Sequence, residues 1–152
     1  MTNSTIKIAL AGLGTVGSAV FKLLQEMSPV ISNRTGKLME IIAVSARDRS
    51  RDRGLSLEKV VWYEDAVEMA KDSGADIVVE LIGGSDGIAF DVCDATLSNG
   101  KDFVTANKAL LAHHGLYFTK KAEEACLSIG YEAAVAGAIP VIKALREGLS
   151  SN

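Results

Sequence analysis

The 152-residue sequence is poor in the residues and segments that mark several protein classes. Its two cysteines, Cys93 and Cys126, are far apart and neither belongs to a C-x-x-C pair, so we expect neither a disulfide framework nor a zinc finger. Both stand among apolar residues, which predicts that they are core thiols. No run of about eighteen apolar residues is present, and Met1–Thr5 lacks the features of a signal peptide. We therefore predict no membrane partner and a cytoplasmic location.

Other absences narrow the possible functions. The net charge is −3 and no basic stripe is interleaved with aromatic residues, which argues against nucleic acid as a partner. A G-x-S-x-G nucleophile elbow and a phosphate-binding lysine after the glycines are both missing, so hydrolase and NTPase functions are not expected. His113 and His114 have no cysteine or acidic cluster at metal-ligand spacing, and we expect them to be exposed.

What the sequence does contain, near its start, is a glycine turn between two apolar segments. Ile8 and Leu10 belong to an apolar run that leads into the turn, and apolar residues recur at helical spacing after it. The G-x-G-x-x-G spacing suits a dinucleotide: one glycine for the turn, one for close approach of the pyrophosphate and one for close packing of the helix. The candidate cofactor-binding residues here are Gly12, Leu13, Gly14, Thr15, Val16 and Gly17.

Apolar periodicity along the rest of the chain predicts alternating strands and helices. Strands are expected at 6–11, 39–44, 59–63, 76–82, 102–105 and 131–135, and helices at 16–27, 64–71, 86–97, 115–128 and 140–147, with a loop at 30–37. Strands joined by such crossovers form a parallel sheet with helices on both faces. We predict one α/β domain over residues 1–152, a doubly wound parallel sheet of the Rossmann dinucleotide-binding type.

The end of the second predicted strand should face the ribose of the adenosine. An arginine there accommodates a 2'-phosphate, whereas an acidic residue accepts a hydrogen bond from a 2'-hydroxyl. Arg47 suits the first role and its neighbour Asp48 suits the second. The sequence therefore favours NADP and leaves NAD open.

Three further segments of the sequence have both a functional and a structural interpretation. Gly83 and Gly84 leave space beside a bound nicotinamide, although an ordinary loop would also use them. Thr105–Lys108 follows a strand at the edge where ligands bind, so Lys108 can contact cofactor or substrate oxygen atoms, or else be a solvated lysine. Glu132 interrupts an apolar strand, where it needs a partner or an ion if buried and none if it faces water.

Four motifs give the chain a resemblance to the N-terminal part of homoserine dehydrogenase. They are G-L-G-T-V-G at 12–17, E-L-I-G-G at 80–84, V-T-A-N-K-A-L at 104–110 and Y-E-A-A-V-A-G-A-I-P at 131–140. The resemblance covers nearly the whole chain. It implies an oxidoreductase that interconverts L-homoserine and L-aspartate 4-semialdehyde with NAD(P), in threonine and methionine biosynthesis.

The resemblance also implies roles for particular residues. The glycine turn, Arg47, Gly83 and Thr105 would bind the cofactor, and Lys108 would lie beside nicotinamide and substrate as the catalytic residue. A sodium ion would be held by the Glu132 side chain and by main-chain carbonyls. The carbonyls implied are those of Val135, Gly137 and Ile139.

The sequence departs from the family in one respect. Family members continue into a second domain that binds homoserine and makes most of a homodimer contact, and the 152 residues do not include it. We therefore expect the chain to bind NAD(P) but to turn over homoserine negligibly by itself. The alternatives are a nucleotide-sensing regulatory module, because fold does not fix function, and another amino-acid-pathway enzyme such as aspartate dehydrogenase or dihydrodipicolinate reductase.

Overall fold

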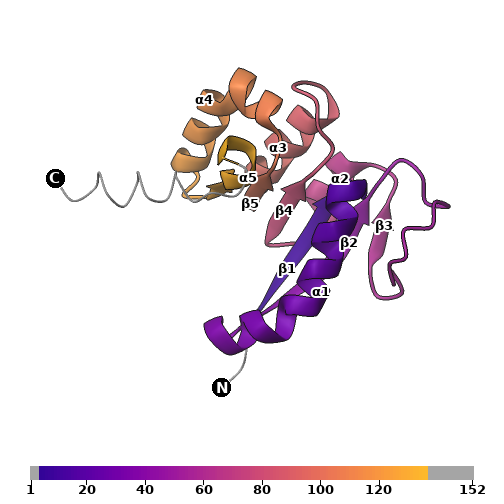
Figure 1. Cartoon of the computed structure of the whole chain (residues 1–152). Coiled ribbons are helices and arrows are strands. Elements are labelled where there is room, and N and C mark those ends of the chain that lie inside the picture. Colours follow the sequence, from indigo (N-terminus) through magenta and orange to yellow (C-terminus); the bar gives the residue numbers. More distant parts are fainter. Residues whose placement is uncertain (1–3, 137–152) are drawn as a thin grey trace.

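The chain forms a parallel six-stranded sheet in the order β3-β2-β1-β4-β5-β6 (Figure 1). The computed structural model describes residues 4–136. The strands are β1 (Ser4–Ala11), β2 (Lys37–Ser45), β3 (Val61–Tyr63), β4 (Ile77–Glu80), β5 (Asp102–Thr105) and β6 (Ile129–Gly130). The helices are α1 (Thr15–Thr35), α2 (Ala66–Asp72), α3 (Ile88–Ser98), α4 (Lys108–Glu124) and α5 (Glu132–Ala136). The predicted doubly wound fold is confirmed.

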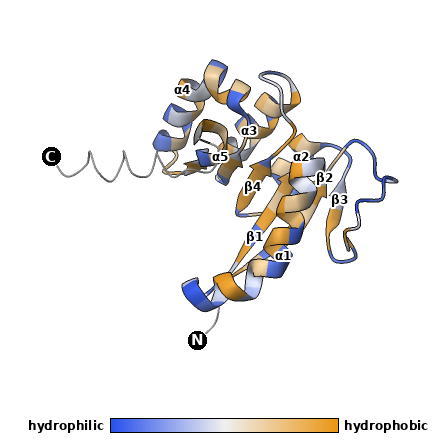
Figure 2. Ribbon diagram, in the orientation of Figure 1, coloured by the Kyte–Doolittle hydropathy of each residue, from blue (hydrophilic) through white to orange (hydrophobic). Residues whose placement is uncertain are grey.

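The alternation of side chains along β1 builds a separate core on each face of the sheet. Ile8 and Leu10 point to one face, where they pack with Phe21 of α1. Ala9 and Ala11 point to the other face, which helices α2, α3 and α4 cover. The strands are strongly hydrophobic whereas the segment between β2 and β3 is hydrophilic, as Figure 2 shows. Leu55, Leu57 and Val60 of this segment still pack against the core, whereas its charged part, from Arg47 to Arg53, borders the cleft.

The first helix is longer than the sequence predicts. We expected it to stop near Ser28–Pro29 and a loop to occupy 30–37, but α1 continues to Thr35 with Pro29 inside it. Pro29 lies on the exposed side, while Ile31 and the hydroxyl of Ser28 remain turned inward, and that hydroxyl donates to the Met39 carbonyl of β2 at 3.1 Å. Packing along β2 thus outweighs the backbone bond that proline removes.

The prediction of a strand at 131–135 is wrong. The two-residue β6 ends at Gly130, before this segment, and the chain then forms α5 from Glu132. A short segment that is apolar except for one residue fits a helix as well as a strand, because periodicity alone does not separate them. The helix predicted for 115–128 begins seven residues earlier, at Lys108, because Asn107 caps it by accepting from the Leu110 amide at 3.1 Å. The helix predicted for 140–147 lies outside the described residues.

The two cysteines differ from each other, contrary to our prediction. Cys93 is buried in α3, and this burial raises the pKa of its thiol. Cys126 is exposed and has a positive φ of 55°, because α4 has already ended at Glu124 and the chain reverses there. Cys126 is therefore not a core thiol.

Candidate functional site

The strand register aligns five residues along the carboxyl edge of the sheet. Tyr63 is paired with Ser45, Ser45 with Ala11, Ala11 with Glu80, and Glu80 with Thr105. In open parallel sheets ligands bind outside this edge, at the point where the strand order reverses. Here the order reverses between β1 and β4, so the loops after β1, β2, β4 and β5 form the candidate site.

The glycine turn after β1 is shaped by two glycines and left open by the third. Gly12 has a φ of 107°, and a Cβ on it would lie 2.8 Å from the Leu81 carbonyl carbon. A Cβ on Gly17 would lie 1.9 Å from the Gly12 carbonyl oxygen, so α1 can approach the turn only without a side chain there. A Cβ on Gly14 would meet nothing within 4 Å. Packing therefore does not require a glycine at position 14, and the space beside Gly14 is open to a ligand.

The start of α1 has backbone donors but no capping side chain. Gly14 is the N-cap residue and makes no side-chain hydrogen bond to the first turn. The first N–H groups of a helix have no partner within it, and they carry the positive end of the helix dipole. Thr15 and Val16 are exposed at this point. An anion such as a pyrophosphate suits these donors, so the observed residues fit the phosphates of a dinucleotide.

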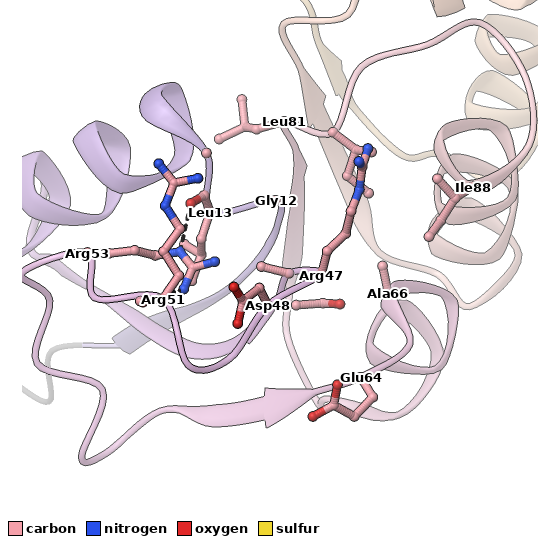
Figure 3. A pocket seen from close by; sticks show the side chains of 14 residues that line it. Gly12, Leu13, Arg47, Asp48, Arg51, Arg53, Glu64, Ala66, Leu81 and Ile88 are labelled. Carbon is pink, nitrogen blue, oxygen red and sulfur yellow. Dashed lines mark hydrogen bonds between the residues drawn. The ribbon is translucent and has the colours of Figure 1, made fainter.

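A cleft of about 320 Å³ lies in front of the glycine turn (Figure 3). Its lining comes from the turn, from the loop after β2, from the connection between β3 and α2, from the loop after β4 and from the start of α3. The lining residues are Gly12, Leu13, Gly14, Ser45, Ala46, Arg47, Asp48, Arg51, Arg53, Glu64, Ala66, Leu81, Ile82 and Ile88. The cleft therefore runs across the point where the strand order reverses.

The loop after β2 supplies what we call the arginine end of the cleft, made of Arg47, Arg51 and Arg53. Arg47 extends between the glycine turn and Ile88, while Arg51 and Arg53 lie beside Leu13 (Figure 3). Within residues 4–136, the Arg47 guanidinium has no hydrogen bond or ion pair. It is consequently available to a ligand group in the cleft.

The Asp48 carboxylate is hydrogen-bonded within its own loop. Its carboxylate accepts hydrogen bonds from the Ser50 hydroxyl at 2.7 Å and the Ser50 amide at 2.9 Å. These bonds hold the pKa of Asp48 below its ordinary value. Of the two candidates for the ribose end, the unengaged Arg47 is thus the better placed to meet a ligand.

Arg53 joins the arginine end to the glycine turn, a contact that the sequence did not reveal. Its Nε donates to the Leu13 carbonyl at 2.9 Å, and its NH1 donates to the Arg51 carbonyl at 2.8 Å. The guanidinium also lies 5.7 Å from the ring centroid of Trp62. Arg53 therefore orients both loops, across forty residues of sequence.

On the other side of the cleft, a buried carboxylate organises the loops after β4 and β5. Glu80 is 0% exposed. Its Oε1 accepts from the amides of Ile82 at 2.6 Å and Gly83 at 2.9 Å, and its Oε2 accepts from the Thr105 hydroxyl at 2.7 Å. Those donors satisfy the charge that burial would otherwise leave unpaired.

Asn107 extends these contacts to the start of α4. Its amide donates to the Thr105 hydroxyl oxygen at 2.9 Å, and its Nδ2 donates to the Gly84 carbonyl at 2.6 Å. We call the contacts among Glu80, Thr105, Asn107 and the 82–84 backbone the glutamate network. Lys108 follows directly as the first residue of α4 and is exposed.

The remaining predicted site residues differ in how exposed they are and in the elements to which they belong. Gly83 is exposed with a positive φ of 85°, whereas Thr105 is 1% exposed, so its hydroxyl is used inside the protein. Glu132 is not in a strand but in the first turn of α5, exposed, with Val135 also exposed. Gly137 and Ile139 lie outside the described residues.

The two histidines lie at α4 in different surroundings. His113 is exposed as expected, whereas His114 is half-buried and lies with its Nε2 2.8 Å from the Asp86 carboxylate. Between Ser4 and Ala136, no three residues among the histidines, cysteines, aspartates and glutamates gather as metal ligands would. None of the helices in that range is both long and apolar enough to cross a membrane.

The chain is similar in sequence and in fold to homoserine dehydrogenases. A family model described as "Homoserine dehydrogenase, NAD binding domain" matches residues 12–132. The homoserine dehydrogenase of Pseudomonas aeruginosa is 41% identical over 147 residues, which are 97% of this chain and 33% of that protein. The solved structure of a homoserine dehydrogenase from Thiobacillus denitrificans matches with a TM-score of 0.86 at 36% identity, over 98% of this chain and 34% of that one.

A more distant structure shares the fold. It is a hyperthermophilic archaeal homoserine dehydrogenase, 21% identical, with a TM-score of 0.77 over 94% of this chain and 48% of that one. The chain spans about a third of the length of the Pseudomonas aeruginosa and Thiobacillus denitrificans proteins.

Proposed function

The chain belongs to the homoserine dehydrogenase family as its NAD-binding domain, and from that premise we propose that it holds the NAD(P) of an enzyme interconverting L-homoserine and L-aspartate 4-semialdehyde. The membership takes precedence over the aspartate dehydrogenase and dihydrodipicolinate reductase alternatives. The observation that carries the proposal is the glycine turn, where Gly12 and Gly17 are required by packing and Gly14 is left open at the start of α1.

At the arginine end we propose NADP as the preferred form of the cofactor. Arg47 is unengaged and lines the cleft, whereas Asp48 is held by Ser50. A guanidinium binds a phosphate through charge-assisted hydrogen bonds, which a 2'-hydroxyl cannot match. The archaeal homoserine dehydrogenase with the same fold was solved in complex with NADPH, which supports this choice.

For the chemistry, the bound nicotinamide would supply or accept the hydride. The amides of the glycine turn would bind the pyrophosphate and fix where the cofactor lies. Gly83 and Gly84, without side chains, would leave room for the nicotinamide. Lys108 would donate to an oxygen atom of the substrate and stabilise the negative charge that develops there.

The substrate, the compartment and the assembly of the whole protein are proposals too. The relatives are about three times as long as this chain, and we propose that their additional part binds L-homoserine and forms the homodimer contact. The cytoplasmic location stays a prediction. We expect the 152 residues to bind NADPH while oxidising homoserine negligibly.

We propose in addition a sodium ion near Glu132. Its exposed carboxylate in the first turn of α5, with Val135 nearby in sequence, supports a site completed by the carbonyls of Gly137 and Ile139. Sodium chloride should raise the melting temperature of the parent above that in potassium chloride of equal ionic strength. Glu132→Gln should remove the difference. Equal melting of the parent in both salts would end the sodium proposal.

The cofactor proposal is tested by calorimetric titration of the chain with NADPH and with NADH. We expect both to bind and NADPH to bind more tightly, and a separate assay should show negligible homoserine oxidation. Absence of heat and of any melting shift with either cofactor would contradict the proposal. Rapid oxidation of homoserine by the purified chain would contradict the assignment of the substrate site to another domain.

A further inference from the structure

Glu80 is the most deeply buried charged side chain of the described residues, and cofactor contact does not explain it. Its side chain is 0% exposed and lies at the carboxyl end of β4, in the row that faces the ligand edge. Burying an unpaired carboxylate would cost several kcal/mol, roughly, so its partners determine whether the fold tolerates it. Two of these partners lie in the loop after β4, where Ile82 lines the cleft, and the third lies at the end of the neighbouring strand β5.

The first two partners fix the loop after β4. The amides of Ile82 and Gly83 converge on the same oxygen, Oε1, at 2.6 and 2.9 Å. Gly83 and Gly84 have φ values of 85° and 90°. Glycine adopts this conformation freely but also many others, so the glycines alone do not fix the loop. The carboxylate therefore selects one conformation for a loop that could adopt many.

The third partner carries the same constraint to the loop after β5. The Thr105 hydroxyl donates to Oε2 and accepts from the Asn107 amide, so it is used in both directions. Asn107 then binds the Gly84 carbonyl through Nδ2 and caps α4 through Oδ1. The two loops are thus closed into one ring of hydrogen bonds, with Lys108 attached to it.

We propose that Glu80 is a positioning residue: through Thr105 and Asn107 it holds Gly83, Gly84 and Lys108 as one unit that receives the nicotinamide half of the cofactor. The sheet topology determines which half of the cofactor lies here. With the adenosine at β2, a dinucleotide lying across the switch point must extend its other half over β4 and β5. The inference rests on the proposed function and assigns Thr105, which we expected to touch the cofactor, to this internal role.

The experiment compares two ligands on matched variants of the chain. The ligands are NADPH and 2'-phospho-ADP-ribose, which has the adenosine and pyrophosphate but lacks the nicotinamide. Thr105→Val removes the hydroxyl at nearly constant volume, whereas Thr105→Ser keeps it. We expect Thr105→Val to weaken NADPH binding about tenfold, since it leaves a charged acceptor without one of its donors. Binding of 2'-phospho-ADP-ribose should change less than about twofold, and Thr105→Ser should restore NADPH affinity.

A second variant covers the case in which Thr105→Val does not fold. Asn107→Asp keeps the oxygen that caps α4 but loses the Nδ2 donor to Gly84. It should show the same selective loss of NADPH affinity. Amide hydrogen exchange offers a readout without cofactor: Ile82 and Gly83 should exchange faster in Thr105→Val than in Thr105→Ser.

The outcomes separate this inference from the proposed function. Equal weakening of both ligands, or unchanged NADPH binding in both variants, would overturn the positioning role. A parent that binds 2'-phospho-ADP-ribose as tightly as NADPH would overturn it as well, while leaving the cofactor site in place. A parent that binds neither ligand would overturn the proposed function and this inference together.

Discussion

The two ends of the ligand edge are built in opposite ways. At the arginine end, Arg47 and Arg51 are exposed, and Arg47 has no partner within residues 4–136. In the glutamate network, which borders the cleft through Ile82, the polar groups of Glu80 and Thr105 are buried and are satisfied by each other and by the amides of Ile82, Gly83 and Asn107. Groups without a partner can recognise a ligand directly, whereas satisfied groups can act only by fixing the geometry of what surrounds them. Substitutions at the two ends should accordingly fail in different ways.

The largest expected effect comes from closing the glycine turn. Gly17→Ala places a Cβ where only 1.9 Å separates it from the Gly12 carbonyl oxygen, so α1 must move. We expect a loss of about 3 kcal/mol or more in the free energy of unfolding. Gly14→Ala is the matched control, because its Cβ meets nothing within 4 Å.

Urea unfolding and NADPH titration together check this pair. Gly14→Ala should unfold like the parent and yet bind NADPH more weakly, because its methyl occupies the space of the pyrophosphate. If Gly14→Ala lost stability as Gly17→Ala does, the glycines would serve packing alone.

The next largest effect is expected in the glutamate network. Glu80→Ala leaves the amides of Ile82 and Gly83 and the Thr105 hydroxyl without their acceptor. We expect a loss of roughly 3 kcal/mol in the free energy of unfolding, and of about 1 to 2 kcal/mol for Glu80→Gln, which keeps one oxygen as acceptor. Chemical denaturation measures both. Equal stability of parent and Glu80→Ala would show that the network contributes nothing to the fold.

Arg47 should show the reverse behaviour, with binding changed and stability kept. Arg47→Ala should weaken NADPH binding about tenfold to a hundredfold through loss of a charge-assisted contact, and NADH binding should hardly change. Its melting temperature should match that of the parent, since Arg47 bonds to no described residue. A constant ratio of the two affinities would refute the 2'-phosphate role.

Arg53 tests whether the arginine end also has a positioning element. Arg53→Met removes the donor to the Leu13 carbonyl and should weaken NADPH and NADH alike, by about threefold to tenfold. Arg49→Met is the control, because Arg49 also lies near Trp62, at 6.0 Å, but has no bond to the glycine turn. Calorimetry on both variants decides the matter, and a loss confined to NADPH would instead make Arg53 a phosphate ligand.

The smallest effect concerns pH and the helices beside the glutamate network. Asp94 of α3 accepts from Lys121 at 2.5 Å and from Tyr117 at 2.9 Å, both on α4. Burial raises the pKa of Asp94, but these hydrogen bonds outweigh it and hold the pKa below its ordinary value. Stabilisation by a carboxylate with a lowered pKa is complete above the unfolded value of about 4 and is lost as the pH falls through the folded value.

Asp94→Asn should therefore lower the free energy of unfolding at neutral pH by less than about 1 kcal/mol, because solvent screens this partly exposed pair. The difference from the parent should disappear in acid. Denaturation curves at neutral pH and below pH 4, roughly, measure it. A difference that persisted in acid would mean that Asp94 acts by packing instead of charge.

The sequence was most informative where a pattern is local. Apolar runs predicted the sheet, the glycine spacing predicted a turn at the carboxyl edge, and the end of the second strand predicted that Arg47 lies at this edge. It failed where tertiary packing overrides a local signal: Pro29 did not end α1, because the helix packs along β2 on its other side. The segment from Tyr131, apolar except for Glu132, fits either period, and from Glu132 it forms α5 instead of a strand.

The polar contacts of the site were beyond sequence reasoning for a different reason. Arg53 reaches Leu13 across forty positions, and Glu80 meets Thr105 across twenty-five. Neither pair shares a helix face or a turn, so no spacing rule connects them. The register of parallel strands brings Glu80 beside Thr105, and that register becomes visible only in the folded chain.

Trp62 gives the chain a built-in optical probe. It is the one tryptophan of the sequence, and its ring lies near Arg49 and Arg53, beneath the loop that borders the cleft. Its buried indole nitrogen has no hydrogen-bond partner within residues 4–136. Its fluorescence is therefore sensitive to changes in the surroundings of the arginine end. Emission that responds to 2'-phospho-ADP-ribose as it does to oxidised NADP, whose nicotinamide does not absorb tryptophan emission, would follow occupation of that end without any attached label.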